Sequence, residues 1–88
     1  MTAPVEVLLY GRPDCHLCDA ARREINLLAK ERGWDLSLRE VDIESDDELF
    51  KRYLERIPVV AVEGDVVSEL VLDSDALIRR IATVAADG

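Results

Sequence analysis

Apolar residues in the first third of the chain follow the pattern of a strand and then that of a helix. Residues 5–10 form a largely apolar run, as expected of a central strand. Residues 11–14 interrupt it, and from about Cys15 apolar side chains recur every three or four positions, which indicates a helix with one buried face. The members of that face are Cys18, Ala21, Ile25 and Leu28. Gly33 is a suitable residue to end the helix.

The middle of the chain predicts a second strand and a short helix. An extended run over residues 35–42 has as its apolar members Leu36, Leu38 and Val41. The sequence Ser-Asp-Asp-Glu that follows is a capping box, with Ser45 as the N-cap and Glu48 at the third helical position. The helix that it opens carries Leu49, Phe50, Tyr53 and Leu54.

The last third of the chain predicts a hairpin and a final helix. Residues 58–62 and 65–71 have the composition of strands, and they flank Glu63-Gly64. A two-residue connection that ends in glycine is typical of a β-hairpin. Asp73 or Ser74 can cap the final helix. Its apolar residues are Leu77, Ile78, Ile81 and Ala85.

The predicted order, β-α-β-α-β-β-α, places the chain in the α/β class. A strand–helix–strand crossover makes the first two strands parallel, and the hairpin adds an antiparallel pair beside them. We therefore expect a four-stranded mixed sheet with helices on both faces. The length of 88 residues suits a single domain over residues 1–88.

Composition and charge narrow the classes of function. The formal net charge is −8, and no basic stripe is present that could neutralise nucleic-acid phosphates or bind an anionic membrane. No apolar run approaches the roughly 20 residues that span a bilayer, and the N-terminus lacks the pattern of a secretory signal. We therefore expect the protein to lie in the cytoplasm, where thiols are kept reduced, with neither nucleic acid nor membrane as a partner. We also expect a monomer.

The only two cysteines, Cys15 and Cys18, stand three residues apart where the first predicted strand gives way to a helix. Cβ atoms at this spacing lie about 5–6 Å apart, so a small adjustment closes a disulfide. In an intracellular chain this pattern is typical of a thioredoxin-like redox module. Because Cys18 continues the buried helix face and Cys15 lies at the positive end of the helix dipole, we predict Cys15 as the nucleophile and Cys18 as the resolving thiol.

The sequence leaves the roles of three other residues open. Arg12 either adds positive potential at Cys15 or is a solvated loop residue. His16, the only histidine, fits a solvent-facing spacer better than a residue that tunes the thiolate. Pro58 opens a predicted strand, and the general preference of X–Pro bonds alone would leave its peptide bond trans.

Three segments together resemble the small glutaredoxin-like proteins of the thioredoxin fold: Tyr-Gly-Arg-Pro-Asp-Cys-His-Leu-Cys at residues 10–18, Val-Asp-Ile at 41–43 and Ile-Pro-Val at 57–59. The resemblance runs from about Val5 to about Ala85. It implies that Pro58 is cis and lies against the disulfide. It also implies that the Ile57 backbone pairs with an extended substrate segment. For glutathione as a substrate, the residues available to hold its carboxylates are Arg12 and Arg56.

The chain departs from glutaredoxins in two places. Arg56-Ile57-Pro58 stands where they usually carry Thr-Val-Pro. Val71-Leu72 stands where they place a glycine pair, and these side chains prevent the same close approach of backbone to glutathione. The electron donor is therefore left open between glutathione and a reductase.

From these observations we expect a dithiol oxidoreductase that reduces protein or glutathione mixed disulfides through Cys15 and Cys18. We expect no bound cofactor and no metal. One alternative is a metal or iron–sulfur site, for which the chain offers Cys15, Cys18 and His16 against the four ligands of structural zinc. A second alternative is a non-catalytic adaptor. A third is a purely structural disulfide, which is a weak explanation because the short loop closed by Cys15 and Cys18 would remove little chain entropy.

Overall fold

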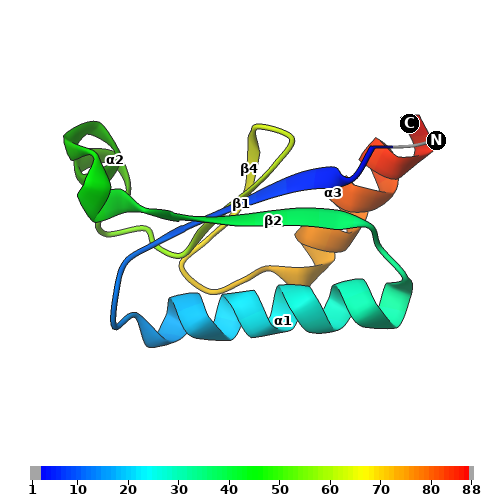
Figure 1. The fold of residues 1–88 in the computed structure, drawn as a ribbon, viewed down its shortest axis with the longest axis horizontal. Coiled ribbons are helices and arrows are strands. Elements are labelled where there is room, and N and C mark those ends of the chain that lie inside the picture. Colours follow the sequence, from blue (N-terminus) through cyan, green and yellow to red (C-terminus); the bar gives the residue numbers. More distant parts are fainter. Residues whose placement is uncertain (1–2, 88) are drawn as a thin grey trace.

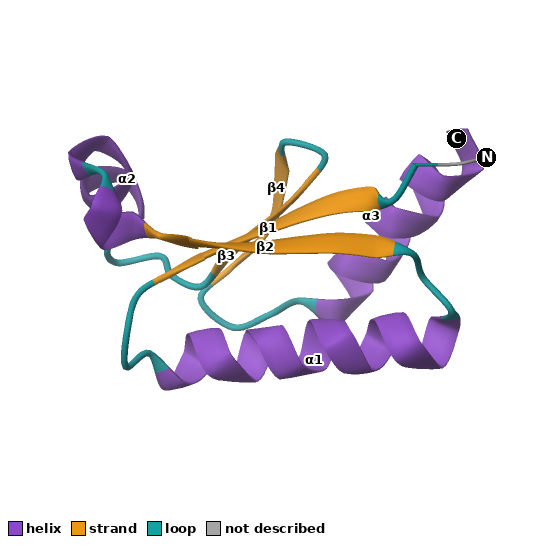
Figure 2. Ribbon diagram, in the orientation of Figure 1, coloured by secondary structure: helices purple, strands orange, loops and turns teal. Residues whose placement is uncertain are grey.

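The computed structural model describes residues 3–87, and in this part of the chain four strands form one mixed sheet (Figures 1 and 2). The strands lie in the order β2-β1-β3-β4. β1 and β2 are parallel, whereas β1–β3 and β3–β4 are antiparallel. The predicted α/β fold and its mixed sheet are thereby confirmed. The strands are β1 (Val5–Gly11), β2 (Leu36–Asp42), β3 (Val59–Val62) and β4 (Asp65–Glu69).

The helices cover the two faces of the sheet unequally. Helices α1 and α3 lie on one face, whereas the short α2 lies near one end of the sheet (Figure 1). Tyr10 points away from the α1 face because its neighbour Leu9 belongs to the core on that face, and its ring lies 4.9 Å from that of Tyr53 on α2. The prediction of helices on both faces is confirmed, with α2 packing on the end of the second face. The helices are α1 (His16–Arg32), α2 (Asp47–Tyr53) and α3 (Ser74–Asp87).

Two buried clusters hold these elements together. The larger joins the sheet to α1 and α3, and it contains Val7, Leu9, Ala21, Ile25, Leu28, Val60, Val62, Leu77 and Ile81. Trp34 is partly buried and packs against this cluster. The smaller cluster lies at the C-terminal end of β1 and consists of Cys18, Ile43, Tyr53, Ile57 and Val59. One of the two cysteines is thus part of the packed interior.

Most predicted element ends agree with the structure. Gly33 ends α1 in the left-handed conformation, with φ 67° and its N–H donated to the carbonyl of Ala29. Glu63 and Gly64 both have positive φ, 48° and 89°, as a tight hairpin turn requires. Asp73 rather than Ser74 caps α3, because its carboxylate accepts the N–H of Ala76 at 3.0 Å.

The predicted capping box at Ser45 is wrong. Ser45 ends a short 3-10 turn, η1 (Ile43–Ser45), and its hydroxyl donates to the carbonyl of Asp42 at 2.6 Å. The helix therefore starts one residue later, with Asp46 as the N-cap. The Asp46 carboxylate accepts the N–H groups of Glu48 and Leu49 at 2.8 and 3.3 Å.

The last strand is shorter than predicted. β4 ends at Glu69 because Leu70 has the left-handed φ of 64°, which breaks the extended conformation. The buried Ser68 then holds the following loop: its hydroxyl accepts the N–H of Asp73 at 2.8 Å and lies 3.3 Å from the carbonyl of Val71. β3 likewise begins at Val59, one residue after the predicted start at Pro58.

Candidate active site

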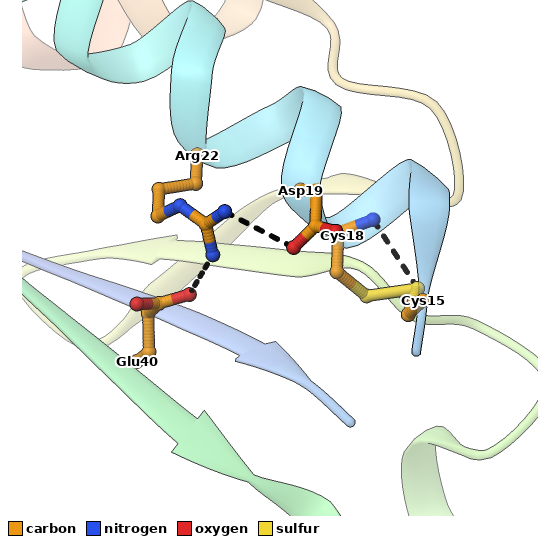
Figure 3. A network of polar contacts seen from close by, with 5 residues as sticks. All are labelled: Cys15, Cys18, Asp19, Arg22 and Glu40. Carbon is orange, nitrogen blue, oxygen red and sulfur yellow. Dashed lines mark hydrogen bonds and ion pairs between the residues drawn. A yellow bond between two sulfur atoms is a disulfide. The ribbon is translucent and has the colours of Figure 1, made fainter. Parts of the chain in front are cut away.

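The two cysteines lie at the start of α1 and form a disulfide, with their Cα atoms 5.2 Å apart (Figure 3). Cys15 is the N-cap of the helix. Its sulfur accepts the backbone N–H of Cys18 at 3.2 Å, in the place where a capping oxygen usually lies. A sulfur in this position receives both a hydrogen bond and the positive end of the helix dipole.

The two cysteine residues differ in exposure. Cys18 is only 5% exposed and lies on the same helix face as Ala21, Ile25 and Leu28, as the helical spacing predicts. Cys15 is partly exposed and packs against the edge of the smaller cluster. His16 is exposed, which agrees with a solvent-facing spacer. Of the two residues, Cys15 is therefore the more accessible to solvent.

Gly11, the last residue of β1, lies directly beside Cys18. A Cβ atom at position 11 would be 2.9 Å from Sγ and 3.2 Å from Cβ of Cys18. The sequence presents Gly11 only as a loop breaker. Its contact with Cys18 depends on how the end of β1 packs against the start of α1, which the sequence alone does not show.

The peptide bond between Ile57 and Pro58 is cis, as the resemblance implies. Pro58 is fully buried, and its neighbours Ile57 and Val59 belong to the same cluster as Cys18. Tyr10 is paired with Val59 in the antiparallel register of β1 and β3. Continuing this register by one residue brings Pro58 opposite Gly11, at the end of the sheet where the cysteines lie.

Arg12 and Arg56 line different hollows. Arg12 is exposed and lines an open cleft of about 320 Å³ between the loop after β1, the first turns of α1 and the end of β2. Arg56 lines a hollow at the end of α2 and forms an ion pair with Glu69 at 3.7 Å. The two arginines expected to hold glutathione thus line two separate hollows.

A charged network beside the redox pair was not predicted. Arg22 on α1 contacts the carboxylate of Asp19 at 3.1 Å and that of Glu40 on β2 at 2.9 Å (Figure 3). The hydrogen bond and charge of Glu40 raise the pKa of Arg22 above its usual value. The Asp19–Arg22 spacing of three could have indicated half of this network, but nothing local indicates Glu40. All three residues line the cleft that reaches Cys18.

Residues 3–87 contain neither a cluster of metal-ligating side chains nor a membrane-spanning helix. No group of three histidine, cysteine or acidic side chains there is arranged to hold a metal ion. None of the helices in that range combines the length and apolarity needed to cross a membrane. Met1 and Thr2, part of the N-terminal segment on which the secretory-signal prediction rests, lie outside the described residues.

Residues 6–82 match the family described as glutaredoxin-like domain. Among curated protein sequences, none is significantly similar to the chain.

Solved structures are similar over most of the chain. The protein Ne2328 of Nitrosomonas europaea has a TM-score of 0.79 at 27% identity, over 91% of this chain and 94% of its own. The protein XcR50 of X. campestris has a TM-score of 0.65 at 31% identity, over 88% of this chain and 96% of its own. A thioredoxin-2, described as a component of malaria parasite protein secretion machinery, has a TM-score of 0.63 at 22% identity, over 94% of this chain and 85% of its own. The last similarity shows the thioredoxin-like fold.

Proposed function

The chain belongs to the glutaredoxin-like domain family, and from that membership and the Cys15–Cys18 pair we propose that it is a dithiol thiol–disulfide oxidoreductase. The Cys15 thiolate attacks a substrate disulfide, forms a mixed disulfide and releases the first substrate thiol. The Cys18 thiolate then attacks the Cys15 sulfur, which releases the second thiol and leaves the Cys15–Cys18 disulfide. An external dithiol, or two thiols, restores the pair by giving up two electrons and two protons.

The observation that carries this proposal is the position of the Cys15 sulfur as the N-cap of α1, accepting the Cys18 N–H. Lowering a thiol pKa from about 8.5 to about 7 raises the thiolate fraction at pH 7 roughly 16-fold. Intrinsic nucleophilicity falls roughly fivefold over the same range, so attack gains only about threefold. The larger benefit is in the second step, where a stabilised Cys15 thiolate is the better leaving group.

The surroundings of Pro58 favour a protein disulfide over glutathione as the substrate. Arg56, a candidate partner for a glutathione carboxylate, is already paired with Glu69. Leu70, whose N–H bonds to the Arg56 carbonyl at 2.9 Å, is 50% exposed, and Val71 is 71% exposed. Leu70 and Val71 can therefore contact an apolar residue of an extended protein segment that pairs with the Ile57 backbone, just before β3.

The remaining features of the cycle follow from this chemistry. We place the activity in a monomer in the cytoplasm, where thiols are kept reduced. Either glutathione or a reductase can serve there as the electron donor, and no bound cofactor is needed for two sulfurs to exchange. Arg12, exposed three residues before Cys15, is proposed to add positive potential for the approaching substrate.

A turnover assay tests the proposal. Wild-type protein should speed the reduction of a model protein disulfide by dithiothreitol, and Cys15→Ser should abolish the acceleration. Reduced Cys18→Ser, mixed with the same disulfide after dithiothreitol has been removed, should react once and remain as the mixed disulfide. If wild-type and Cys15→Ser proteins reduce the disulfide equally fast, the proposal is wrong.

A further inference from the structure

We infer that Gly11 is a positioning residue for the redox pair: its missing side chain makes the space in which the Cys18 sulfur lies while it is bonded to Cys15. The inference deepens the proposed function and rests on it only for the biological use of the pair. A Cβ at position 11 would lie 2.9 Å from the Cys18 Sγ, a separation too short for two such atoms.

The backbone of Gly11 gives no other reason for glycine. Gly33 and Gly64 are the glycines with positive φ among the described residues, at 67° and 89°, and both have open space where a Cβ would point. Gly11 is instead a regular residue of β1, paired with Asp42. An alanine could adopt its backbone conformation without strain, so the Cys18 side chain is the obstacle that such a change would meet.

The two redox states respond differently to this obstacle. In the disulfide, the Cys18 sulfur is held at one end by the α1 backbone and at the other by its bond to Cys15, so it cannot rotate away. In the dithiol, that bond is absent and the Cys18 side chain is free to take another staggered rotamer. A side chain at position 11 therefore destabilises the disulfide more than the dithiol, and Gly11 sets the balance between them.

The direct test is the equilibrium of Gly11→Ala with dithiothreitol. Reduction transfers two electrons and two protons from dithiothreitol to the Cys15–Cys18 disulfide and leaves oxidised dithiothreitol. Because overpacking by one methyl group is felt in a packed interior, we expect the equilibrium constant to shift about tenfold toward the dithiol. For this couple that change is about 30 mV. A shift of less than about twofold, or a shift toward the disulfide, would overturn the inference.

Gly33→Ala is the matched control, because it places the same methyl group at the far end of α1 in a strained conformation. It should lower the denaturant midpoint of both redox states and leave the dithiothreitol equilibrium within twofold of wild type. An equal shift in both variants would show a general effect of stability and contradict the role of Gly11.

A second measurement covers the case in which Gly11→Ala folds poorly. Combined with Cys18→Ala, the substitution should lower the denaturant midpoint clearly less than it does with Cys18 present, because the sulfur is gone and only the contact with Cβ at 3.2 Å remains. An equal loss in the presence and absence of the Cys18 sulfur would refute the inference. These equilibria need no protein substrate, so a pair that cycles with dithiothreitol but reduces no protein disulfide would overturn the proposed function alone.

Discussion

Cys15 and Cys18 are one helical turn apart, yet their sulfurs have different surroundings. Cys15 caps the helix at a partly exposed position, whereas Cys18 is 5% exposed and packs beside Ile43 and Val59. Burial among apolar groups raises a thiol pKa, and a helix N-terminus lowers it. The different roles proposed for the two thiols therefore follow from one turn of helix.

Alkylation of the reduced protein tests this difference. At pH 7 we expect iodoacetamide to label Cys15 at least about tenfold faster than Cys18, because only Cys15 combines access with a stabilised thiolate. Mass spectrometry of the labelled peptides gives both rates in one experiment. Urea-unfolded protein is the control, in which the two rates should become similar. Faster labelling of Cys18 in the folded protein would contradict the assigned roles.

At the scale of elements, the ends of helices and strands were predictable where a single nearby residue in the sequence determines them. The buried face of α1 and its end at Gly33 follow from spacing and from glycine alone. The start of α2 was misplaced by one residue because Ser45 and Asp46 both have suitable side chains, and the η1 turn decided between them. The end of β4 was misplaced because Leu70 adopts a conformation that sequence does not favour in leucine.

The start of α2 can be tested by paired substitutions. Asp46→Ala should lower the free energy of unfolding by about 1 kcal/mol, because it removes the acceptor for the N–H groups of Glu48 and Leu49. Ser45→Ala should cost clearly less, since its hydroxyl bonds only the exposed Asp42 carbonyl. Urea denaturation of both variants gives the comparison. A larger loss of stability for Ser45→Ala than for Asp46→Ala would show that Ser45, and not Asp46, is the N-cap of α2.

The loop after β4 allows a test of the proposed substrate class. Val71→Ser should lower kcat/KM for a protein disulfide by about fivefold, the effect of losing about 1 kcal/mol of apolar burial, and should leave glutathione disulfide unaffected. Leu27→Ser is the control, because Leu27 is another exposed apolar side chain, at 50% against 71% for Val71, but lies on α1 away from this loop. If both variants slow the reaction equally, or if only glutathione disulfide is affected, the preference for protein is wrong.

For the whole molecule, the excess of acidic residues has a consequence for partners. The net charge of −8 attracts basic proteins over a distance that salt shortens, since the screening length falls from about 30 Å at 0.01 M to about 10 Å at 0.1 M. We therefore expect kcat/KM for a basic protein disulfide to fall as salt rises over this range. An acidic substrate of similar size should show the opposite trend. Equal rates at all salt concentrations for both substrates would exclude steering by charge.

Contacts between distant parts of the chain were the least predictable feature of the site. The order of elements indicated the sheet, and the resemblance indicated the cis bond before Pro58. Neither indicated that Glu40 would reach Arg22, that Glu69 would pair with Arg56, or that Gly11 would lie against Cys18. Each contact joins residues on different elements, so it depends on how the elements pack rather than on local pattern.

The most direct test of the central claim is a comparison of trapped mixed disulfides. Reduced Cys18→Ser and Cys15→Ser proteins are each exposed to an oxidised model protein, and disulfide-linked products are identified by mass spectrometry without reductant. The proposed division of roles between the two thiols predicts a stable adduct through Cys15 in the Cys18→Ser protein and almost none in the Cys15→Ser protein. Equal trapping by both variants, or trapping only through Cys18, would contradict it.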